Sequence, residues 1–294
     1  MTTDPQDGTG NGCLYLVATP IGNLEDLTFR AVRTLREVDL IAAEDTRRTA
    51  KLLAHCAIRK PMVSLREHNE YREAPRLVAR LERGENIALV SDAGTPGIAD
   101  PGARLVKAAR DAGVLAVPIP GPSAITAALS VAGIEASEFV FMGFPPPKGS
   151  DRARWFERLR IEPRTVVAFE APHRISLTVS DIGSISIKRP IIVVHEITKL
   201  NYSLVEWNNE SNNSVISPLG EFVIVVPPAA LADASVESAA MAETIFGYMT
   251  EKCAVTPTLA RAATGLALDI HPDAIDKAIR VGRKLAKRQK MAGP

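Results

Sequence analysis

The stretch SDAGTPGIADPG, residues 91–102, directly follows the apolar run IALV at residues 87–90. A short apolar run that ends in glycine and proline is typical of a buried strand leading into a loop. The loop holds three glycines, two prolines and two aspartates, and neither lysine nor arginine. The helical pattern GARLVKAARDAG comes next, so this part of the chain predicts a strand, a loop and a helix in that order.

The same alternation runs through the whole first half of the chain. Strands are expected at LYLV (14–17), DLIAAED (39–45), MVSL (62–65), NIALVSD (86–92) and VLAVPIP (114–120), with helical patterns between them. Nearly continuous apolar strands that alternate with helices predict a mostly parallel sheet covered on both faces. Right-handed crossovers then place all strand-to-helix loops at one edge of the sheet.

A second block begins near Gly121, with strands expected at FVFMGF, TVVAFEA, RPIIVVHEI and EFVIVVP. The segment between the last two is rich in asparagine and serine and predicts a turn-rich hairpin. After residue 228 the chain becomes alanine-rich and helical, with helix starts expected at Pro257 and Pro272. We therefore expect an α/β fold with a flexible tail (1–12), an N-terminal α/β domain (13–120), a second α/β domain (121–228) and a helical C-terminal unit with a basic tail (229–294).

Composition excludes several classes of protein. The 294 residues carry a net charge of +1, so any contact with nucleic acid must come from local patches. Three widely spaced cysteines without a CxxC argue against a disulfide framework or a zinc ribbon and suit a reducing cytoplasm. The five histidines are scattered, so no metal site is expected. Prolines interrupt the uncharged segment 112–134, and we expect no membrane span.

Four turns share one design, in which an apolar strand runs into glycine, proline and small polar residues. They are ATPIGNLED (18–26), AAEDTRRT (42–49), SDAGTPGIADPG (91–102) and PGPSAITAA (120–128). Each follows an expected strand, so all four should meet at the carboxyl edge of a sheet, where open α/β sheets bind ligands. Taken singly, each turn could equally be a tight connection without a ligand.

The turns also indicate the kind of ligand. The chain has no GxxxxGK[ST] loop and no GxGxxG after its first strand, which disfavours nucleotide triphosphates and dinucleotides. A zwitterionic or cationic ligand with an adenosine part fits better, with Asp92 available to a positive group.

Long motifs in a fixed order carry a family resemblance. They include LYLVATPIGNLEDLTFRAVRTLREVDLIAAEDTRRTAKLL, SLREHNE, ALVSDAGTPGIADPGARLV, PIPGPSAITAALSVAG, FMGFPPPK, FEAPHR and HEITK. In these motifs, from about residue 14 to residue 227, the chain resembles the bacterial 16S ribosomal RNA cytidine 2′-O-methyltransferases of the tetrapyrrole methylase-like superfamily.

The resemblance implies two α/β domains with an S-adenosylmethionine site in the cleft between them, in a homodimer. The methyl acceptor would be the ribose 2′-hydroxyl of a cytidine in the decoding centre of the small ribosomal subunit. Carried over by position, the residues beside the cofactor would be Pro20, Ile21, Asp92, Gly94, Thr95, Gly121, Ser123 and Ala124.

Methyl transfer requires alignment of the acceptor oxygen with the methyl group and removal of the hydroxyl proton. The candidates for this chemistry are Glu44, Asp45, Glu170 and Lys199. A lysine in a partly dry cleft beside a cationic cofactor could have a lowered pKa and act as a base. The alternative for Glu44, Asp45 and Arg47 is a salt-bridged cap at the start of a helix.

Contact with RNA needs basic side chains that reach phosphate groups. The candidates are Arg47, Arg48, Lys148, Arg152, Arg283, Lys284 and Lys287. The last three lie in a C-terminal run of six basic residues within eleven positions, which could instead be a solvated helix face.

The chain departs from the family pattern at three places, all in the second domain. His195 stands where arginine is usual before ELTK, Ala171 stands where serine is commoner, and an asparagine-rich stretch fills residues 201–217. Three other functions therefore stay open. They are a tetrapyrrole methyltransferase, which should carry a glycine-proline-glycine turn after the first strand, a non-catalytic ribosome-assembly factor and, more remotely, a dinucleotide-linked oxidoreductase.

Overall fold

The computed structural model describes residues 10–134, 136–185, 189–207, 218–228, 236–268 and 272–291. The chain divides into two compact units, Met1–Val131 with Val194–Ser203, and Ala132–Val193 with Leu204–Pro294. Most of the tail predicted at residues 1–12 falls outside the described residues.

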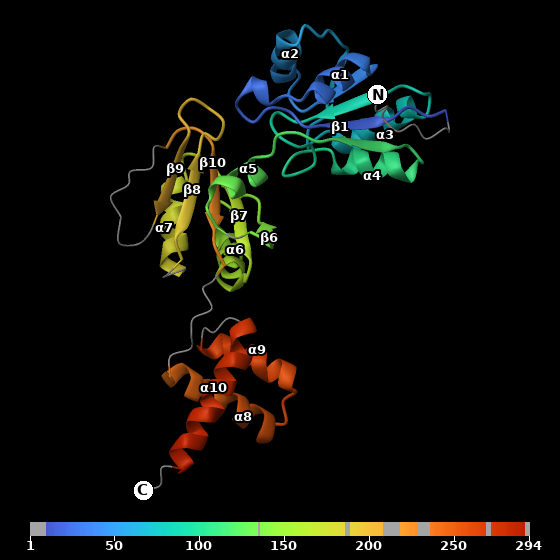
Figure 1. The fold of residues 1–294 in the computed structure, drawn as a ribbon. Helices are drawn as coiled ribbons and strands as arrows, with labels where there is room; N and C mark the ends of the chain where they lie inside the picture. The colour runs from blue at the N-terminus through green and yellow to red at the C-terminus, as the bar shows by residue number, and fades with distance from the viewer. Residues whose placement is uncertain are drawn as a thin grey trace. The chain divides into compact units, whose positions relative to one another are not determined.

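The first unit contains a five-stranded sheet in the order β3-β2-β4-β1-β5. Figure 1 labels its strand β1 and the helices α1 to α4 of the same unit. Its strands are β1 (Leu14–Val17), β2 (Leu40–Ala43), β3 (Met62–Ser64), β4 (Ile87–Val90) and β5 (Ala116–Ile119). All four neighbouring pairs are parallel. The predicted parallel sheet is therefore confirmed, strand by strand.

Helices cover both faces of this sheet. Helices α1 (Phe29–Glu37) and α2 (Thr46–His55) contribute to one core, and α3 (Glu70–Leu81) and α4 (Ala103–Asp111) to the other. The chain leaves β1 toward one face and the neighbouring β4 toward the opposite face. Adjacent strands with helices on opposite faces open a crevice at their carboxyl ends, which is where open α/β sheets bind ligands.

The second unit contains a mixed sheet in the order β6-β7-β10-β8-β9. Its strands are β6 (Phe139–Phe141), β7 (Thr165–Glu170), β8 (Ile191–His195), β9 (Ser203–Trp207) and β10 (Phe222–Val226). Strand β6 pairs with β7 in parallel, whereas β10 pairs with β7 antiparallel. The predicted strands are confirmed, but β9 forms a strand inside the stretch predicted as a turn-rich hairpin, and residues 208–217 lie outside the described residues.

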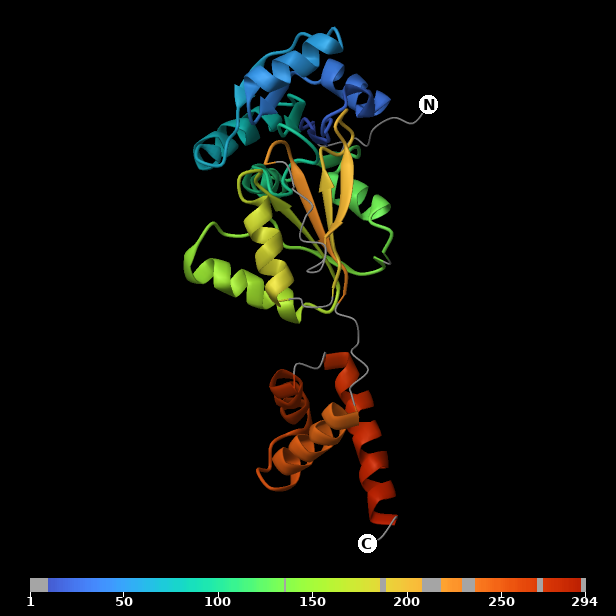
Figure 2. The same cartoon turned by 90° about the vertical axis from the view of Figure 1, so that its left-hand side faces the viewer.

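Two helices cover one face of the second sheet, as Figure 2 shows: α6 (Gly149–Ile161) and α7 (Ile175–Ile185). Trp155 and Leu159 of α6 and Val179 of α7 share a core with Trp207. The sequence predicts α6 but not α7.

Three C-terminal helices have a core of their own. They are α8 (Val236–Glu251), α9 (Pro257–Leu268) and α10 (Pro272–Met291), and the last two begin at the predicted prolines. Ile275 and Ile279 of α10 pack with Phe246 of α8. At Gly282 a Cβ atom would lie 2.1 Å from the carbonyl oxygen of Ala239, so only glycine allows α10 to cross α8 this closely. No helix in the described ranges is both long and apolar enough to cross a membrane.

Candidate functional site

Three glycine-containing turns converge at the carboxyl edge of the first sheet. The main chains of Thr19 and Gly94 exchange two hydrogen bonds of 2.9 Å, which tie the turn after β1 to the turn after β4. The Thr95 hydroxyl donates to the carbonyl of Pro122 at 3.4 Å, which adds the turn after β5. A Cβ at Gly121 would lie only 3.1 Å from that of Ala18, so glycine lets the first and third turns approach.

The structure therefore gathers the three turns that carry the predicted cofactor residues, on neighbouring strands β4, β1 and β5. The predicted cofactor residues on these turns are Pro20, Ile21, Asp92, Gly94, Thr95 and Gly121, together with Ser123 and Ala124 at the start of α5 (Ala124–Val131).

The loop at residues 91–102 is held rigidly at its far end. Ala99 and Gly102 both have positive φ angles, 61° and 132°, so the chain turns sharply before α4 begins. The buried carboxylate of Glu70 accepts hydrogen bonds from the amides of Gly102, Arg104 and Leu105 at 2.9–3.1 Å. A negative charge at a helix N-terminus is favourable, and here it fixes the path of the loop. Sequence reasoning missed this role, because Glu70 lies on another helix.

Reciprocal hydrogen bonds link the turns after β2 and β4. The Glu44 carboxylate accepts from the amide of Asp92 at 3.1 Å, and the Asp92 carboxylate accepts from the amide of Asp45 at 3.0 Å. Asp92 also pairs with Arg48 at 3.3 Å, but the Arg48 side chain is 68% exposed. An exposed pair of this kind is worth little, so a cationic ligand could replace Arg48 beside Asp92.

Asp45 forms the helix cap that the sequence left open as the alternative to catalysis. Its carboxylate accepts from the amide of Arg47 at 2.9 Å and pairs with the guanidinium of Arg47 at 2.6 Å. The hydrogen bonds from Arg47 hold the pKa of Asp45 well below its usual range. A carboxylate with so low a pKa is a weak base, which favours the cap. Arg47 itself is 83% exposed and can reach a partner.

Asp100, in the same loop, is a titratable group that sequence reasoning missed. Burial is the main cause that raises the pKa of Asp100 to about 6, and the negative charges of Glu44 and Asp92 raise it further. A hydrogen bond from Ser91 acts in the opposite direction and lowers this pKa. Three carboxyl groups therefore share one electrostatic environment at the carboxyl ends of β2 and β4. This negative environment suits a positively charged ligand.

Replacing Asp100 by asparagine should remove a pH dependence of stability. Between the ordinary pKa of 3.8 and about 6 the folded state retains a proton that the unfolded state releases, so the unfolding free energy falls as pH rises through this window. After discounting for solvent screening, we expect the variant to gain about 1 kcal/mol over the native chain at neutral pH and little at pH about 4. Urea unfolding at both pH values measures this, and an equal difference at both would contradict the shift.

The segment HEITK brings Lys199 to the turn after β1. A Cβ at Gly22 would lie 2.5 Å from Cγ of Lys199, so the lysine stem lies directly over the glycine. The Lys199 ammonium pairs with Glu196 at 2.8 Å. Glu196 and Thr198 have φ angles of 51° and 66°, unusual for residues with side chains. Strain of this kind concentrates at functional sites. The predicted proton-handling lysine thus lies beside a predicted cofactor turn.

Glu170, another predicted catalytic residue, lies in a buried ionic network of the second unit. Its side chain is 0% exposed and pairs with Arg174 at 2.6 Å. It also accepts from the Thr178 hydroxyl and the Ala171 amide, both at 2.6 Å. Arg152 joins the network by donating to Thr178 at 3.1 Å. With its oxygens occupied and no exposed surface, Glu170 fits a structural role better than proton transfer.

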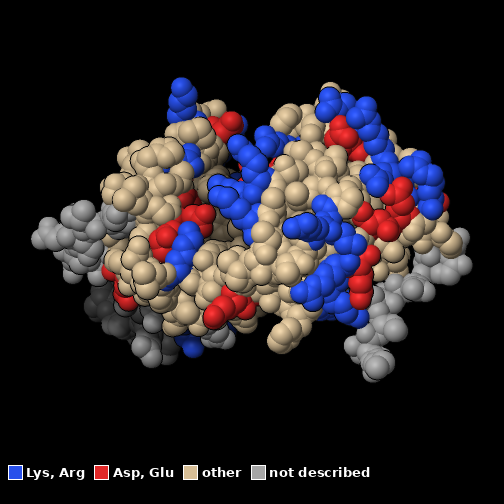
Figure 3. Space-filling model, turned by 90° about the horizontal axis from the view of Figure 1, so that it is seen from above, with Lys and Arg blue, Asp and Glu red and all other residues tan. Residues whose placement is uncertain are grey.

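The predicted RNA-binding residues differ in accessibility. The Arg152 side chain is only 12% exposed and pairs with Asp181, so it is directed inward, whereas Lys148 is exposed. Arg283 and Lys284 are exposed on α10, and Lys287 lies outside the residues whose side chains are described. Figure 3 shows Lys and Arg side chains in several groups with Asp and Glu among them, in keeping with the near-neutral net charge.

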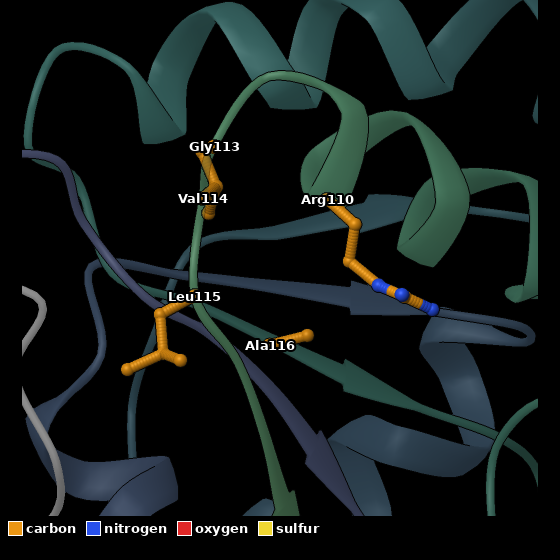
Figure 4. A pocket seen from close by; sticks show the side chains of 5 residues that line it. All are labelled: Arg110, Gly113, Val114, Leu115 and Ala116. Carbon is orange, nitrogen blue, oxygen red and sulfur yellow. The ribbon is translucent and has the colours of Figure 1, made fainter.

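A shallow hollow of about 350 Å³ lies at the opposite edge of the first sheet (Figure 4). It is lined by Arg110, Gly113, Val114, Leu115 and Ala116, where α4 leads into β5. Only one charged side chain lines it, so it offers little chemistry. Within the described part of the chain, no three His, Cys, Asp or Glu side chains are grouped to hold a metal ion.

Solved structures with this fold include a uroporphyrin-III C-methyltransferase from Thermus thermophilus, at 19% identity and a TM-score of 0.50 over 74% of this chain and 94% of that one. A diphthine synthase gives 16% identity and a TM-score of 0.60 over 74% of this chain and 90% of that one. At such identities the likeness concerns the fold alone.

Sequence comparison is more specific. The family model for tetrapyrrole (corrin/porphyrin) methylases matches residues 13–210. A ribosomal RNA small subunit methyltransferase I of Xylella fastidiosa is 47% identical over 76% of this chain and 84% of its own length. The protein of the same name in a Synechocystis strain is 46% identical over 73% of this chain and 78% of its own length. The chain therefore belongs to the tetrapyrrole methylase family and, within it, to the ribosomal RNA small subunit methyltransferase I family.

Proposed function

We propose that this protein uses S-adenosylmethionine to methylate the ribose 2′-hydroxyl of a cytidine in 16S ribosomal RNA, in the decoding centre of the small ribosomal subunit. The observation that carries the proposal is the convergence of three cofactor-type turns at the edge of a methylase sheet, in a chain whose relatives are named for ribosomal RNA. The family resemblance also supports action as a cytoplasmic homodimer.

The described residues fit S-adenosylmethionine by charge. This cofactor carries a positively charged sulfonium group. Asp92 and Asp100 lie in the loop at residues 91–102, which contains no lysine or arginine, and Glu44 from the turn after β2 lies close to them. The same negative charges disfavour phosphate-rich cofactors. Gly121 is exposed and puts no side chain between a ligand and the main chain of its turn, whereas Gly94 is buried and its amide and carbonyl are paired with Thr19.

When bound, S-adenosylmethionine supplies an activated methyl group for in-line transfer to the acceptor oxygen. The protein's own contribution is alignment and handling of the hydroxyl proton. Lys199 is the strongest candidate for the proton, because its stem lies over the turn after β1, whereas Asp45 caps a helix and Glu170 is buried in an ionic network. Glu44 is held by its bond to the Asp92 amide and is better suited to shaping the loop.

Calorimetric titration with S-adenosylmethionine tests the cofactor half of the proposal. Saturable binding is expected, and it should be lost in Gly121→Val, where the added Cβ would lie 3.1 Å from that of Ala18 and the two turns would have to move apart. Absence of binding by the native chain would support a non-catalytic assembly factor instead. Binding without transfer to ribosomal RNA would support a small-molecule acceptor such as a tetrapyrrole.

Three exposed basic residues of α10 should contribute to RNA affinity. Replacing Arg280, Arg283 and Lys284 together by glutamine should weaken binding to 16S ribosomal RNA and flatten its salt dependence. Each phosphate that a cation no longer neutralises makes the slope of log affinity against log salt less steep by roughly 0.7–0.9, so a change of about 2–3 is expected if all three side chains reach phosphates. Filter binding at several salt concentrations measures the slope.

The matched control removes three exposed charges from the first unit by glutamine substitution of Arg104, Lys107 and Arg110 on α4. This control should leave the slope nearly unchanged. Equal slopes for the α10 variant and the native protein would mean that the basic face of α10 is merely solvated.

A further inference from the structure

An unusually exposed aromatic side chain stands on the loop that connects β6 to α6. Phe144 is 52% exposed, yet its ring packs edge-on against Phe169 with a centroid separation of 5.6 Å. Phe169 in turn packs edge-on against Phe141 at 4.8 Å. We call these three rings the Phe144 cluster. Phe169 packs against both other rings, and Phe144 is 52% exposed to solvent.

The loop that carries Phe144 is held in place from two sides. Arg174 donates to the carbonyl of Pro145 at 3.0 Å, and Arg152 donates to the carbonyl of Pro146 at 3.1 Å. Both guanidinium groups are themselves fixed by the buried network, Arg174 by Glu170 and Arg152 by Asp181. Three consecutive prolines further restrict the backbone. These contacts hold the main chain directly after Phe144, and its ring packs against Phe169 while half of the residue stays exposed.

The charges around this loop favour a polyanionic partner. The neighbouring acids are already paired, Glu170 and Asp181 with the two arginines and Asp151 with Arg154. Lys148 is exposed and forms no ion pair within the described residues. Phe144 and Lys148 are thus an exposed aromatic residue and an exposed lysine four positions apart on the same loop. This combination suits single-stranded RNA, in which bases stack on aromatic rings and phosphates meet lysine.

We propose that Phe144 is a stacking platform for one unpaired nucleobase of the RNA substrate, with Lys148 contacting the adjoining phosphate. The inference rests on the proposed function and adds the residue that would hold the substrate base. In this proposal Arg152 and Arg174 do not contact the RNA. They position the loop that carries Phe144 through their hydrogen bonds to Pro146 and Pro145.

The test measures methyl transfer to small ribosomal subunits from cells that lack this protein, with Phe144 replaced by alanine, leucine or tyrosine. Loss of one base stack should raise KM for the subunits about tenfold in the alanine variant and leave kcat little changed. Tyrosine keeps a stacking ring and should retain the native KM. Leucine keeps apolar bulk without a ring and should resemble alanine. Phe139→Ala is the matched control, because Phe139 is 42% exposed but lies at the other end of β6.

Each alternative outcome would overturn the proposal in its own way. A leucine variant with native KM would indicate plain apolar packing against a protein. An alanine variant with native KM would remove Phe144 from recognition, and weaker S-adenosylmethionine binding in that variant would indicate a role in the cofactor site. If the native protein methylates no subunit, the proposed function fails; filter binding of 16S ribosomal RNA by the same variants then tests the platform alone, and equal affinities would contradict it.

Discussion

Replacing Asp92 by asparagine is expected to weaken S-adenosylmethionine binding roughly 30-fold, because it removes the negative charge that attracts this cationic cofactor; a charge-assisted hydrogen bond from the cofactor's ammonium group contributes about 1.5–3 kcal/mol. Asparagine keeps the oxygen that accepts from the Asp45 amide, so the bridge between the turns after β2 and β4 should persist. Only the negative charge is removed, together with an exposed pair to Arg48. The change therefore isolates the attraction between Asp92 and a cationic ligand. Calorimetry measures the affinity, and circular dichroism monitors the fold.

Asp111→Asn is the matched control for charge. Asp111 lies at the C-terminal end of α4, where it is 63% exposed and pairs with Lys107. This variant should bind S-adenosylmethionine as the native protein does. If Asp92→Asn also binds with native affinity, the assignment of the loop at residues 91–102 to the cofactor is wrong.

Replacing Glu170 by alanine is expected to lower the unfolding free energy of the second unit by about 3–5 kcal/mol, because removal of one partner from a buried ion pair leaves the other charge uncompensated. Here Arg174 would be left without its carboxylate. The Thr178 hydroxyl and the Ala171 amide would be left without an acceptor as well. Both tryptophans of the chain, Trp155 and Trp207, lie in the core of this unit, so their fluorescence during urea unfolding reports on it directly.

Two further variants decide between a structural and a catalytic Glu170. Glu157→Ala removes an exposed carboxylate paired with Arg160 on α6 and should change the unfolding free energy by less than about 0.5 kcal/mol. Glu170→Gln keeps the shape of the side chain and removes its charge. If Glu170→Gln keeps the native unfolding free energy but loses all methyl transfer, Glu170 is a catalytic residue and the structural assignment is wrong.

The sequence predicts the first sheet well because local and global signals agree there. The strands are short, mostly apolar runs, such as 87–90, that end in turn or polar residues, and each crossover is a helix of clear periodicity. Helix α7 escaped prediction because ISLTVSDIGSI is rich in β-branched residues and serine, which are weak helix formers. The insertion of β10 between β7 and β8 depends on pairing between distant segments, which no local pattern encodes.

The candidate site shows the same division. The sequence motifs identify the turns that lie together. They do not show which side chains stabilise these turns and which are free to bind a ligand. Glu70 is assigned to the start of α4 only by its three hydrogen bonds across 32–35 residues of sequence. Arg152 has the residue type and loop position of an RNA-binding side chain, yet its partners Asp181 and Thr178 hold it inward. Burial and partner choice are tertiary properties, and they separate positioning residues from ligand-binding residues.

The proposed activity is methyl transfer to a ribose of 16S ribosomal RNA. The most direct measurement incubates the protein with labelled S-adenosylmethionine and small ribosomal subunits from cells that lack it, followed by nucleoside analysis of the RNA. We expect label in 2′-O-methylcytidine, as the proposed function requires. Label in another nucleoside, or no label despite intact cofactor binding, would contradict it.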